Sequence, residues 1–360
     1  MKVVHLVPAM EQGGVESVVL SLSRLLTRAG HENVVVSRGG KLVATLEQEG
    51  SRHIPKDPTS TNPLSYFARA YKLRRLLKSE KPDLVCVHSR VPAWLFVWAN
   101  RSLRLHFITY AHGANSVSRY SEVMTKGELT IMPSRFIADY LKANYPVPEE
   151  KLRVIPLAID FERFNPAALD EAFVAEKRRE WGTEGKRVIM AVGRITQLKS
   201  FDELIRAFSK LKDRASKKLV IVGGADKDKE EYLASLKTLA CELTAPGEVI
   251  FAGAQSRVPE CLSLADIVVS SNVRKPEAFG LSMAEALAMG KGVVAKAFGG
   301  ALDIVRDGID GVLVKDGDFV AAIERALTLD YSTVSASARE RFNESVMLSK
   351  TLSAYEEVVR

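Results

Sequence analysis

The chain is poor in the residues that mark secreted and metal-binding proteins. Only three of its 360 residues are cysteines, and Cys86, Cys241 and Cys261 lie too far apart to match a zinc or disulfide spacing. Such cysteine usage is typical of a reducing compartment, so we expect a cytoplasmic protein. Two Asp-x-Asp patterns, at 226–228 and 316–318, read as a lysine-interleaved charged stretch and a turn. We therefore expect no metal site.

Long apolar runs are also missing. No stretch approaches the roughly 18 residues that a membrane-spanning helix needs, and the strand-like residues 1–10 are too short for a signal peptide. The G-x-G-x-x-G fingerprint of dinucleotide-binding proteins and the G-x-x-x-x-G-K-[ST] loop of P-loop NTPases are both absent. These absences argue against a membrane-spanning protein, a nicotinamide-dependent enzyme and a P-loop nucleotidase.

What is present is an ordinary globular composition with an uneven charge. The chain is 46% hydrophobic and 26% charged, and its length suggests two domains. The net charge of +7 arises in the first half, because residues 1–165 carry +8 and the remainder carries −1. No interleaving of aromatic and basic residues accompanies this charge, so nucleic acid is not expected as a partner.

Much of the positive charge lies in the stretch 66–82, "YFARAYKLRRLLKSEKP". Phe67, Ala70, Leu73 and Leu77 recur there at helical spacing among arginines and lysines. Two interpretations stay open. The helix packs its apolar stripe on a sheet as an ordinary surface element, or its basic face binds an anionic lipid or an anionic acceptor.

Short runs of Val, Ile and Leu alternate with helical patterns along both halves of the chain. Continuous apolar strands between helices predict parallel sheets covered on both faces. We therefore predict an α/β protein with two doubly wound, Rossmann-like domains that face each other across a cleft. The expected boundaries are a first domain at 1–165, a linker at 166–186, a second domain at 187–335 and a helical segment at 336–360.

Ligands of such sheets bind beyond the carboxyl ends of the strands, which draws attention to residues that follow strands. Gly13 and Gly14 follow the first strand and precede a helix, where they form either a tight turn or an anion-binding helix start. His112 follows another strand in "TYAHGANS". It is either a hydrogen-bonded structural residue or a group of the active site.

The second half contributes charges of both signs after its strands. Arg194 ends the first strand there and Lys199 comes five residues later, before a helix. Both are either solvated surface charges or a pair of cations for a diphosphate. Glu277 and Glu285 stand eight residues apart, on either side of a Phe-Gly turn. Alone, they read as a helix-capping acid and a solvated helix residue.

The stretch 276–318, which begins "PEAFGLSMAEALAMG", resembles the donor-binding signature of the GT-B glycosyltransferases of family GT4. The resemblance extends over nearly the whole chain, through "GGVE", "HG", "PSRFIADYL" and "VGRITQLKSFDELIRAF" in the family's order. One departure is Ser200, which stands where the family commonly has glycine after the lysine.

The resemblance implies a role for each of these residues. Arg194, Lys199, Glu277 and His112 would be the catalytic residues, with the two cations holding the donor's diphosphate. The remaining residues would bind the donor, with the carboxylate of Glu285 accepting the ribose hydroxyls; they are Gly13, Gly14, Phe279, Gly280, Leu281 and Glu285.

The resemblance also implies an activity. The expected enzyme is a retaining, metal-independent hexosyltransferase without a cofactor, which uses a UDP- or GDP-sugar and glycosylates a bacterial envelope glycan or glycolipid such as lipopolysaccharide core. Peripheral contact of the basic N-terminal half with the anionic inner face of the cytoplasmic membrane would follow. Two alternatives stay open: a nucleotide-sugar epimerase or hydrolase on the same fold, and a non-catalytic nucleotide-sugar-binding protein.

Overall fold

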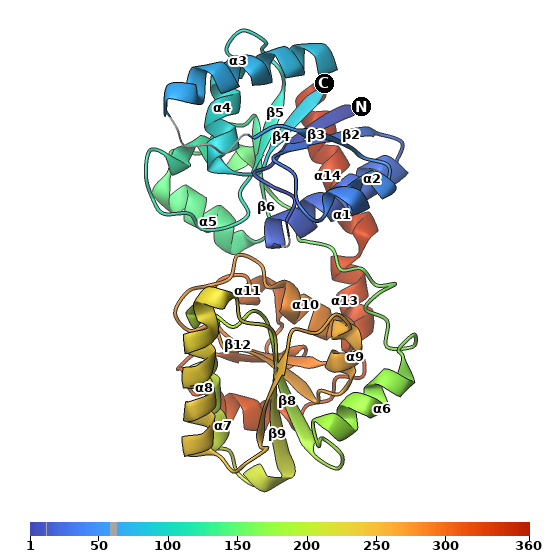
Figure 1. Ribbon diagram of the computed structural model, residues 1–360, viewed down its shortest axis with the longest axis vertical. Coiled ribbons are helices and arrows are strands. Elements are labelled where there is room, and N and C mark those ends of the chain that lie inside the picture. The colour runs from blue at the N-terminus through green and yellow to red at the C-terminus, as the bar shows by residue number, and fades with distance from the viewer. Residues whose placement is uncertain (12, 58–62) are drawn as a thin grey trace. The chain divides into compact units, whose positions relative to one another are not determined.

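The computed structural model describes residues 1–11, 13–57 and 63–360, and it divides them between two compact units (Figure 1). Unit 1 is formed by Met1–Leu157 together with Glu344–Arg360, and unit 2 by Ala158–Asn343. None of the helices in the described ranges has both the length and the apolar character needed to cross a bilayer. The stretch 66–82 lies wholly within the described residues, so its predicted helix can be compared with the structure. Residues 58–62, which precede it, lie outside the described residues.

Unit 1 is built on a seven-stranded sheet with the strand order β3-β2-β1-β4-β5-β6-β7. Every neighbouring pair is parallel. The strands are β1 (Lys2–Leu6), β2 (Glu32–Ser37), β3 (Arg52–Pro55), β4 (Leu84–Val87), β5 (Phe107–Tyr110), β6 (Leu129–Met132) and β7 (Leu152–Val154). The order reverses direction at β1 and β4, which creates a topological switch point between these two strands.

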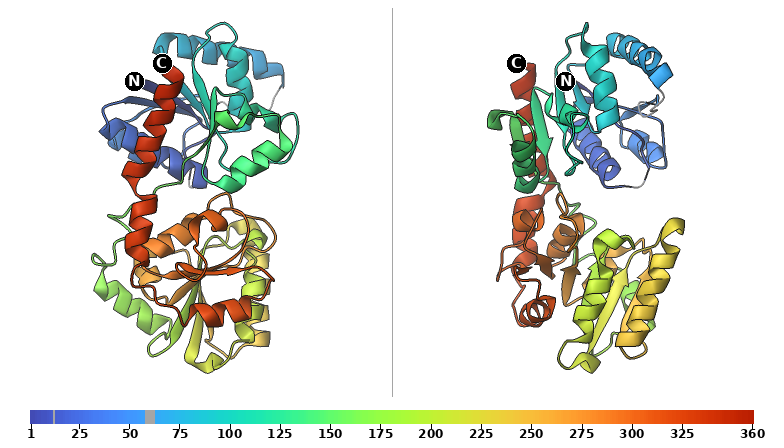
Figure 2. Two further views of the ribbon diagram at one scale, coloured as in Figure 1. Left: turned by 180° about the vertical axis from the view of Figure 1, so that it is seen from behind. Right: turned by 90° about the vertical axis from the view of Figure 1, so that its left-hand side faces the viewer.

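Helices cover both faces of this sheet (Figure 2). One face packs on α3 and α4, where Val4 and Leu6 of β1 join a buried core. On the other face Val7 and Val35 pack beside α1 and α2. The helices of unit 1 are α1 (Gly14–Arg28), α2 (Val43–Gln48), α3 (Pro63–Glu80), α4 (Arg90–Asn100), α5 (Arg135–Asn144) and α14 (Glu344–Val359). Strands buried on both faces explain the unbroken apolar runs in the sequence.

The basic helix is α3, and three of its four predicted apolar positions are buried. Ala70, Leu73 and Leu77 pack into the core. Phe67 was expected in the same stripe, but it is 62% exposed and meets Trp98 edge-on at 5.5 Å between ring centroids. The helix therefore packs on the core through Ala70, Leu73 and Leu77, and the ring of Phe67 stays at the surface.

Helix α14 returns to unit 1 and completes the buried face of its sheet. The hydroxyl of Tyr355 is 2.7 Å from that of Tyr110 on β5, and the thiol of Cys86 on β4 donates to Tyr355 at 3.2 Å. Tyr355 is fully buried, and burial raises the pKa values of the two tyrosines and of Cys86. All three groups therefore stay neutral, and the contact joins residues more than 240 positions apart in sequence.

We expect Tyr355→Ala to lower the free energy of unfolding of unit 1 by about 3–5 kcal/mol, because it empties a fully buried ring site and leaves the Tyr110 hydroxyl without this partner. Tyr355→Phe keeps the ring and should cost only about 1–2 kcal/mol. Urea unfolding, followed by the fluorescence of Trp94 and Trp98, measures the difference. Equal losses in the two variants would contradict the packing argument.

Unit 2 contains a six-stranded sheet with the order β10-β9-β8-β11-β12-β13, and again every pair is parallel. Its strands are β8 (Arg187–Val192), β9 (Lys217–Val222), β10 (Val249–Gly253), β11 (Ile267–Ser270), β12 (Gly292–Lys296) and β13 (Gly311–Val314). The switch point of this sheet lies between β8 and β11. Both sheets agree with the predicted doubly wound α/β fold.

Helices again lie on both faces of the second sheet (Figure 2). Phe201, Leu204 and Phe208 of α7 are buried in one core with Phe319 and Ile323 of α12. The helices of unit 2 are α6 (Glu171–Glu180), α7 (Phe201–Ser209), α8 (Glu230–Leu243), α9 (Val258–Ser263), α10 (Leu281–Ala288), α11 (Ala301–Ile304), α12 (Phe319–Ala326) and α13 (Val334–Phe342).

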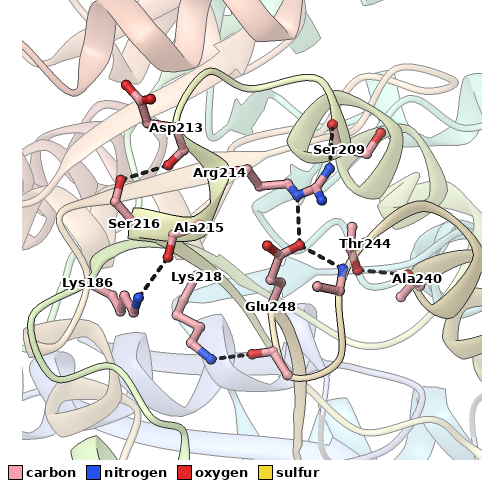
Figure 3. Close-up of polar contacts among 12 residues, drawn as sticks. Lys186, Ser209, Asp213, Arg214, Ala215, Ser216, Lys218, Ala240, Thr244 and Glu248 are labelled. Carbon is pink, nitrogen blue, oxygen red and sulfur yellow. Dashed lines mark hydrogen bonds and ion pairs between the residues drawn. The ribbon is translucent and has the colours of Figure 1, made fainter.

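Polar side chains form hydrogen bonds that stabilise the loops at the amino end of this sheet (Figure 3). Arg214 donates to the carboxylate of Glu248 at 2.7 Å and to the carbonyl of Ser209 at 3.0 Å. The same Glu248 carboxylate accepts the backbone N–H of Ala245 at 2.9 Å. These bonds satisfy loop groups just before β9 and β10, so this end of the sheet is structural.

The structure divides the chain at other points than the sequence analysis does. The first compact stretch ends at Leu157 instead of residue 165, and the segment expected as a linker contains α6, which belongs to unit 2. The segment expected as one terminal helical piece forms two helices, of which α13 belongs to unit 2 and α14 to unit 1. Helical periodicity in the sequence indicates the helices but not the sheet on which each one packs.

Candidate active site

The candidate site of unit 2 lies at the switch point of its sheet, where the carboxyl ends of β8 and β11 are neighbours. The loop after β8 leads through Arg194 to a short 3-10 turn, Gln197–Lys199, and into α7. The loop after β11 leads through Asn272 and Glu277 to α10. Parallel strands that part at this point leave room for the two loops to approach each other.

The structure brings Lys199 and Glu277 into direct contact. The ammonium of Lys199 forms a hydrogen-bonded ion pair with Oε1 of Glu277, and both side chains are largely buried, at 24% and 18% exposed. Asn272 donates from its amide to the same oxygen at 2.9 Å, and Ser271 donates to the backbone carbonyl of Lys199 at 2.7 Å. Lys199 and Glu277 were both predicted as site residues, and the ion pair joins the two loops.

The turn that carries Glu277 is pressed against the loop after β12. The N–H of Gly300 donates to the carbonyl of Glu277 at 2.8 Å, and a side chain at Gly300 would meet the carbonyl oxygen of Phe279 at 2.2 Å. Phe279 itself is buried, with its ring edge-on to Phe342 at 5.9 Å. Only glycine at position 300 permits this close approach, which fixes the backbone leading into α10.

Backbone donors are available at the start of α10. In the described part of the chain, none of the N–H groups of Phe279, Gly280 and Leu281 donates to a protein acceptor. Gly280 has a φ of +110°, a conformation that favours glycine and ends the turn. Free N–H groups at the positive end of a helix dipole attract anions, so these three predicted residues offer the chemistry that a phosphate needs.

Glu285 lies one turn into α10 and is half-buried. Burial raises the pKa of its carboxyl group to about 7, although the charges of Arg163 and Lys199 act in the opposite direction. Its carboxylate makes no hydrogen bond to any residue in the described ranges. A half-buried acid with a raised pKa and free acceptor oxygens is typical of a ligand-binding residue.

Arg194 lies apart from this cluster. Its side chain is 75% exposed, and it forms an ion pair with the carboxylate of Asp226 at 3.9 Å. No hydrogen bond or ion pair links it to Glu277 or Glu285 within the described ranges. The expected convergence of two cations is therefore seen for Lys199 alone, because the long arginine side chain extends into solvent.

Ser200 follows Lys199 in the left-handed conformation, with φ +50° and ψ +43°. A non-glycine residue there costs roughly 1–2 kcal/mol. The hydroxyl of Ser200 accepts weak bonds from Arg274 at 3.4 Å and from the N–H of Val273 at 3.5 Å. The backbone thus has the shape for which the family commonly uses glycine, and the strain lies directly beside the lysine of the site.

Of the predicted residues of unit 1, His112 lines a pocket of about 330 Å³, to which the start of α1 contributes Val15 and Glu16. Arg90 also lines it. Gly13 is the residue before α1 and Gly14 is its first residue, and the space around Gly14 is open. A side chain at Gly13 would meet the Glu16 carboxylate at 2.3 Å. The helix start and His112 therefore belong to one region of unit 1, as their positions after β1 and β5 predict.

Sequence reasoning missed the residues that hold the predicted ones. Asn272 and Ser271 anchor Glu277 and Lys199, and Oδ1 of Asn272 is buried without a partner in the described part of the chain. Their position directly after a buried strand was the available signal. Among the described residues, no group of three His, Cys, Asp or Glu side chains is placed to hold a metal ion.

Two family models match the chain. The model described as "Glycosyl transferases group 1" matches residues 173–346, which include Lys199, Glu277 and Glu285. The model described as "Glycosyltransferase Family 4" matches residues 12–163, which include Gly13 and His112. Every predicted site residue thus falls within one of the two matches.

Solved structures and curated proteins agree with these matches. A glycosyltransferase from Rickettsia africae has a TM-score of 0.90 at 27% identity, over 100% of this chain and 98% of that chain. Anabaena HepE in complex with UDP and glucose has a TM-score of 0.84 at 20% identity, over 99% of both chains, and its likeness shows the fold. An uncharacterized glycosyltransferase of Methanocaldococcus jannaschii is 30% identical over 203 residues, which are 55% of this chain and 50% of that relative.

The chain thus spans about half the length of this curated relative. The two sheets and the solved glycosyltransferases of the same architecture confirm the predicted GT-B fold. The two family matches confirm the predicted family and enzyme class. The chain thus combines a region that matches glycosyltransferase family 4, at residues 12–163, with a region that matches glycosyl transferases group 1, at residues 173–346.

Proposed function

We propose that the protein is a retaining, metal-independent hexosyltransferase that moves a sugar from a UDP- or GDP-sugar to a glycan or glycolipid of the bacterial envelope. The observation that carries the donor assignment is the ion pair between Lys199 and Glu277 at the start of α10, beside three unused backbone N–H groups. This arrangement provides one cation, one carboxylate and a helix start for a diphosphate that carries a sugar.

In this reaction the bond between the anomeric carbon and the diphosphate oxygen breaks, and an acceptor hydroxyl forms the new bond on the same face of the sugar. Lys199 and the N–H groups of Phe279 to Leu281 stabilise the negative charge that develops on the leaving diphosphate, which also accepts the proton of the hydroxyl. Glu277 binds sugar hydroxyls and Glu285 binds the ribose. The protein's own cation and backbone donors are the basis for proposing metal independence.

The donor base and the acceptor follow from separate arguments. HepE, which shares the fold, is described in complex with UDP and glucose, and this favours a uridine nucleotide. The acceptor proposal rests on the activity that the family resemblance implies, together with the basic charge of residues 1–165. The exposed Phe67 on α3 suits peripheral contact with an anionic membrane surface.

We expect UDP or GDP, but not ADP or CMP, to raise the melting temperature. A nucleotide at 100 times its dissociation constant adds about 2.7 kcal/mol, which should shift the melting temperature by about 5–10 °C. Turnover of the matching nucleotide-sugar with an envelope acceptor should continue in EDTA. The variant Lys199→Ala lacks the proposed diphosphate-binding cation, so the nucleotide should raise its melting temperature less.

Three results would contradict this function. If no nucleotide or nucleotide-sugar raised the melting temperature, the result would argue against the donor site. Release or epimerisation of the sugar at an undiminished rate without any acceptor would favour a hydrolase or an epimerase. Loss of activity in EDTA, with recovery on adding Mg²⁺ or Mn²⁺, would overturn metal independence.

A further inference from the structure

Three histidines form a hydrogen-bonded row beneath the pocket of unit 1. His5, His88 and His112 come from the adjacent strands β1, β4 and β5 or from the residues just after them. Nδ1 of His5 is 2.9 Å from Nε2 of His88, and Nδ1 of His88 is 2.9 Å from Nε2 of His112. His88 and His112 both line the pocket, with His112 at the outer end of the row, and His5 is fully buried at the inner end.

All three rings are neutral near pH 7. Burial lowers the pKa values of His5 and His112 to about 4, and it also lowers the pKa of His88, together with the charges that its two neighbours would carry. A neutral imidazole has one N–H and one bare nitrogen. A row of three such rings therefore has only two fully hydrogen-bonded arrangements, in which all the protons point inward or all point toward the pocket.

Asn33 stands at the inner end of the row. Its Oδ1 and the Nε2 of His5 are both buried, and neither forms a hydrogen bond among the described residues. Asn33 and His5 are diagonal neighbours on one face of the β1–β2 pair, in which Val3 opposes Asn33 and His5 opposes Val35. The amide nitrogen of Asn33 donates to Ser51 at 3.1 Å, which directs its carbonyl oxygen away from Ser51. Asn33 also raises the pKa of His5, which is the effect of an acceptor oxygen close to the ring.

We propose that Asn33, His5 and His88 are positioning residues that hold His112 with its proton on Nε2 and its bare Nδ1 toward the pocket, where it accepts a hydrogen bond from a hydroxyl group. Each ring in the row then directs its proton inward: His112 donates to His88, His88 donates to His5, and the N–H of His5 points toward the Asn33 carbonyl. That the hydroxyl belongs to a sugar rests on the proposed function, whereas the proton arrangement does not.

The opposite arrangement is disfavoured at its inner end. It would leave the bare Nε2 of His5 and the carbonyl oxygen of Asn33 as two neighbouring buried acceptors, with no donor for either among the described residues. At the outer end, the row makes His112 a neutral acceptor beside the anionic Glu16 and the cationic Arg90, which also line the pocket. A neutral acceptor selects hydroxyl groups without repelling a nearby phosphate.

Nitrogen-15 NMR of the full-length protein tests the proton arrangement without any substrate. The chain has six histidines, and exposed His106, which contacts Glu128 at 3.0 Å, serves as the reference ring. We expect His112, His88 and His5 each to show a protonated Nε2 and a bare Nδ1. A protonated Nδ1 on His112, or a mixture of both tautomers, would overturn the proposal whether or not the enzyme has the proposed activity.

Two variants at position 33 test whether Asn33 determines the direction in which the protons of the histidine row point. Asn33→Leu removes the acceptor at similar volume, and we expect tautomer mixing at His112 and about a tenfold lower kcat/KM for the nucleotide-sugar. Asn33→Asp keeps an acceptor oxygen and should retain the wild-type tautomer. The affinity for UDP should stay within about twofold in both, because the proposed nucleotide-binding groups lie in unit 2. An unchanged His112 tautomer in Asn33→Leu would refute the role of Asn33, and if that variant fails to fold, the wild-type spectrum still decides.

Discussion

Replacing Lys199 with alanine is expected to lower kcat/KM for sugar transfer by about a hundredfold, and at least tenfold. Lys199 is the cation that the structure places in contact with Glu277 at the start of α10. The negative charge of a diphosphate grows as the sugar leaves, and a cation held in a partly buried position stabilises the transition state more than the bound donor. The loss should therefore appear mainly in kcat.

Lys210→Ala is the matched control, because Lys210 follows the C-terminal end of α7 and is exposed. It removes the same charge from unit 2 and should leave turnover within about twofold. Glu277→Gln should also lower transfer at least about tenfold, since it weakens the anchor of Lys199 and the grip on sugar hydroxyls. Near-normal turnover in both Lys199→Ala and Glu277→Gln, with circular dichroism unchanged, would remove these residues from the active site.

The second large effect is expected at Glu285, where stability and binding should change in opposite directions. Glu285→Gln should weaken the binding of a UDP-sugar by about 10–100-fold, because the amide accepts hydroxyl groups less strongly than a carboxylate does. At pH 8 the same change should raise the free energy of unfolding by about 2 kcal/mol. The reason is that the carboxylate is ionised there in a half-buried place that disfavours the charge.

The raised pKa of Glu285 determines how the free energy of unfolding changes with pH. A carboxyl group whose pKa is about 7 in the folded protein and 4.5 when it is fully hydrated stabilises the fold most below pH 4.5, and this contribution is lost as the pH rises through 7. At pH 4.5 and below, wild type and Glu285→Gln should thus have similar stability. Between pH 6 and 8 the affinity of the wild type for the UDP-sugar should rise with ionisation.

Urea unfolding at pH 4.5 and pH 8, together with calorimetric titration with UDP-glucose across pH 6 to 8, measures both effects. A sugar nucleotide is preferred to free UDP because the terminal phosphate of UDP titrates near pH 6 and would obscure the result. The variant should show a flat affinity profile. A wild-type profile equally flat, or a variant less stable than wild type at pH 8, would contradict the account of Glu285.

Much of the fold follows from the sequence because its signals are local. Unbroken apolar runs such as that of β8 predict strands buried on both faces, and the stripe of α7 predicts a helix packed on them. The meeting of Lys199 and Glu277 is predictable for a related reason, since both follow strands of one parallel sheet. These inferences need only the position of a residue relative to the end of its own strand.

Other features depend on distant partners and leave no local signal. The exposure of Phe67 and of Arg194 depends on what neighbouring elements cover, and a helical repeat or a loop charge does not reveal it. The row of His5, His88 and His112 joins three strands, and its inner partner Asn33 looks like a polar interruption of a strand. Pairings across a sheet require the strand order and register, which the single sequence does not contain.

The return of α14 to unit 1 has a consequence for biosynthesis. When residue 157 has been made, the sheet of unit 1 still lacks the helix that carries Tyr355. The 158–343 segment follows first, and at about 5–20 residues per second its synthesis takes on the order of 10–40 s. During that interval Tyr110 and Cys86 lack the contact with Tyr355, whereas all of the residues of unit 2 are synthesised and able to fold. Unit 1 is thus the first to be started and the last to be completed. Until then the apolar face that α14 covers is exposed, and we expect a ribosome-bound chaperone to bind there.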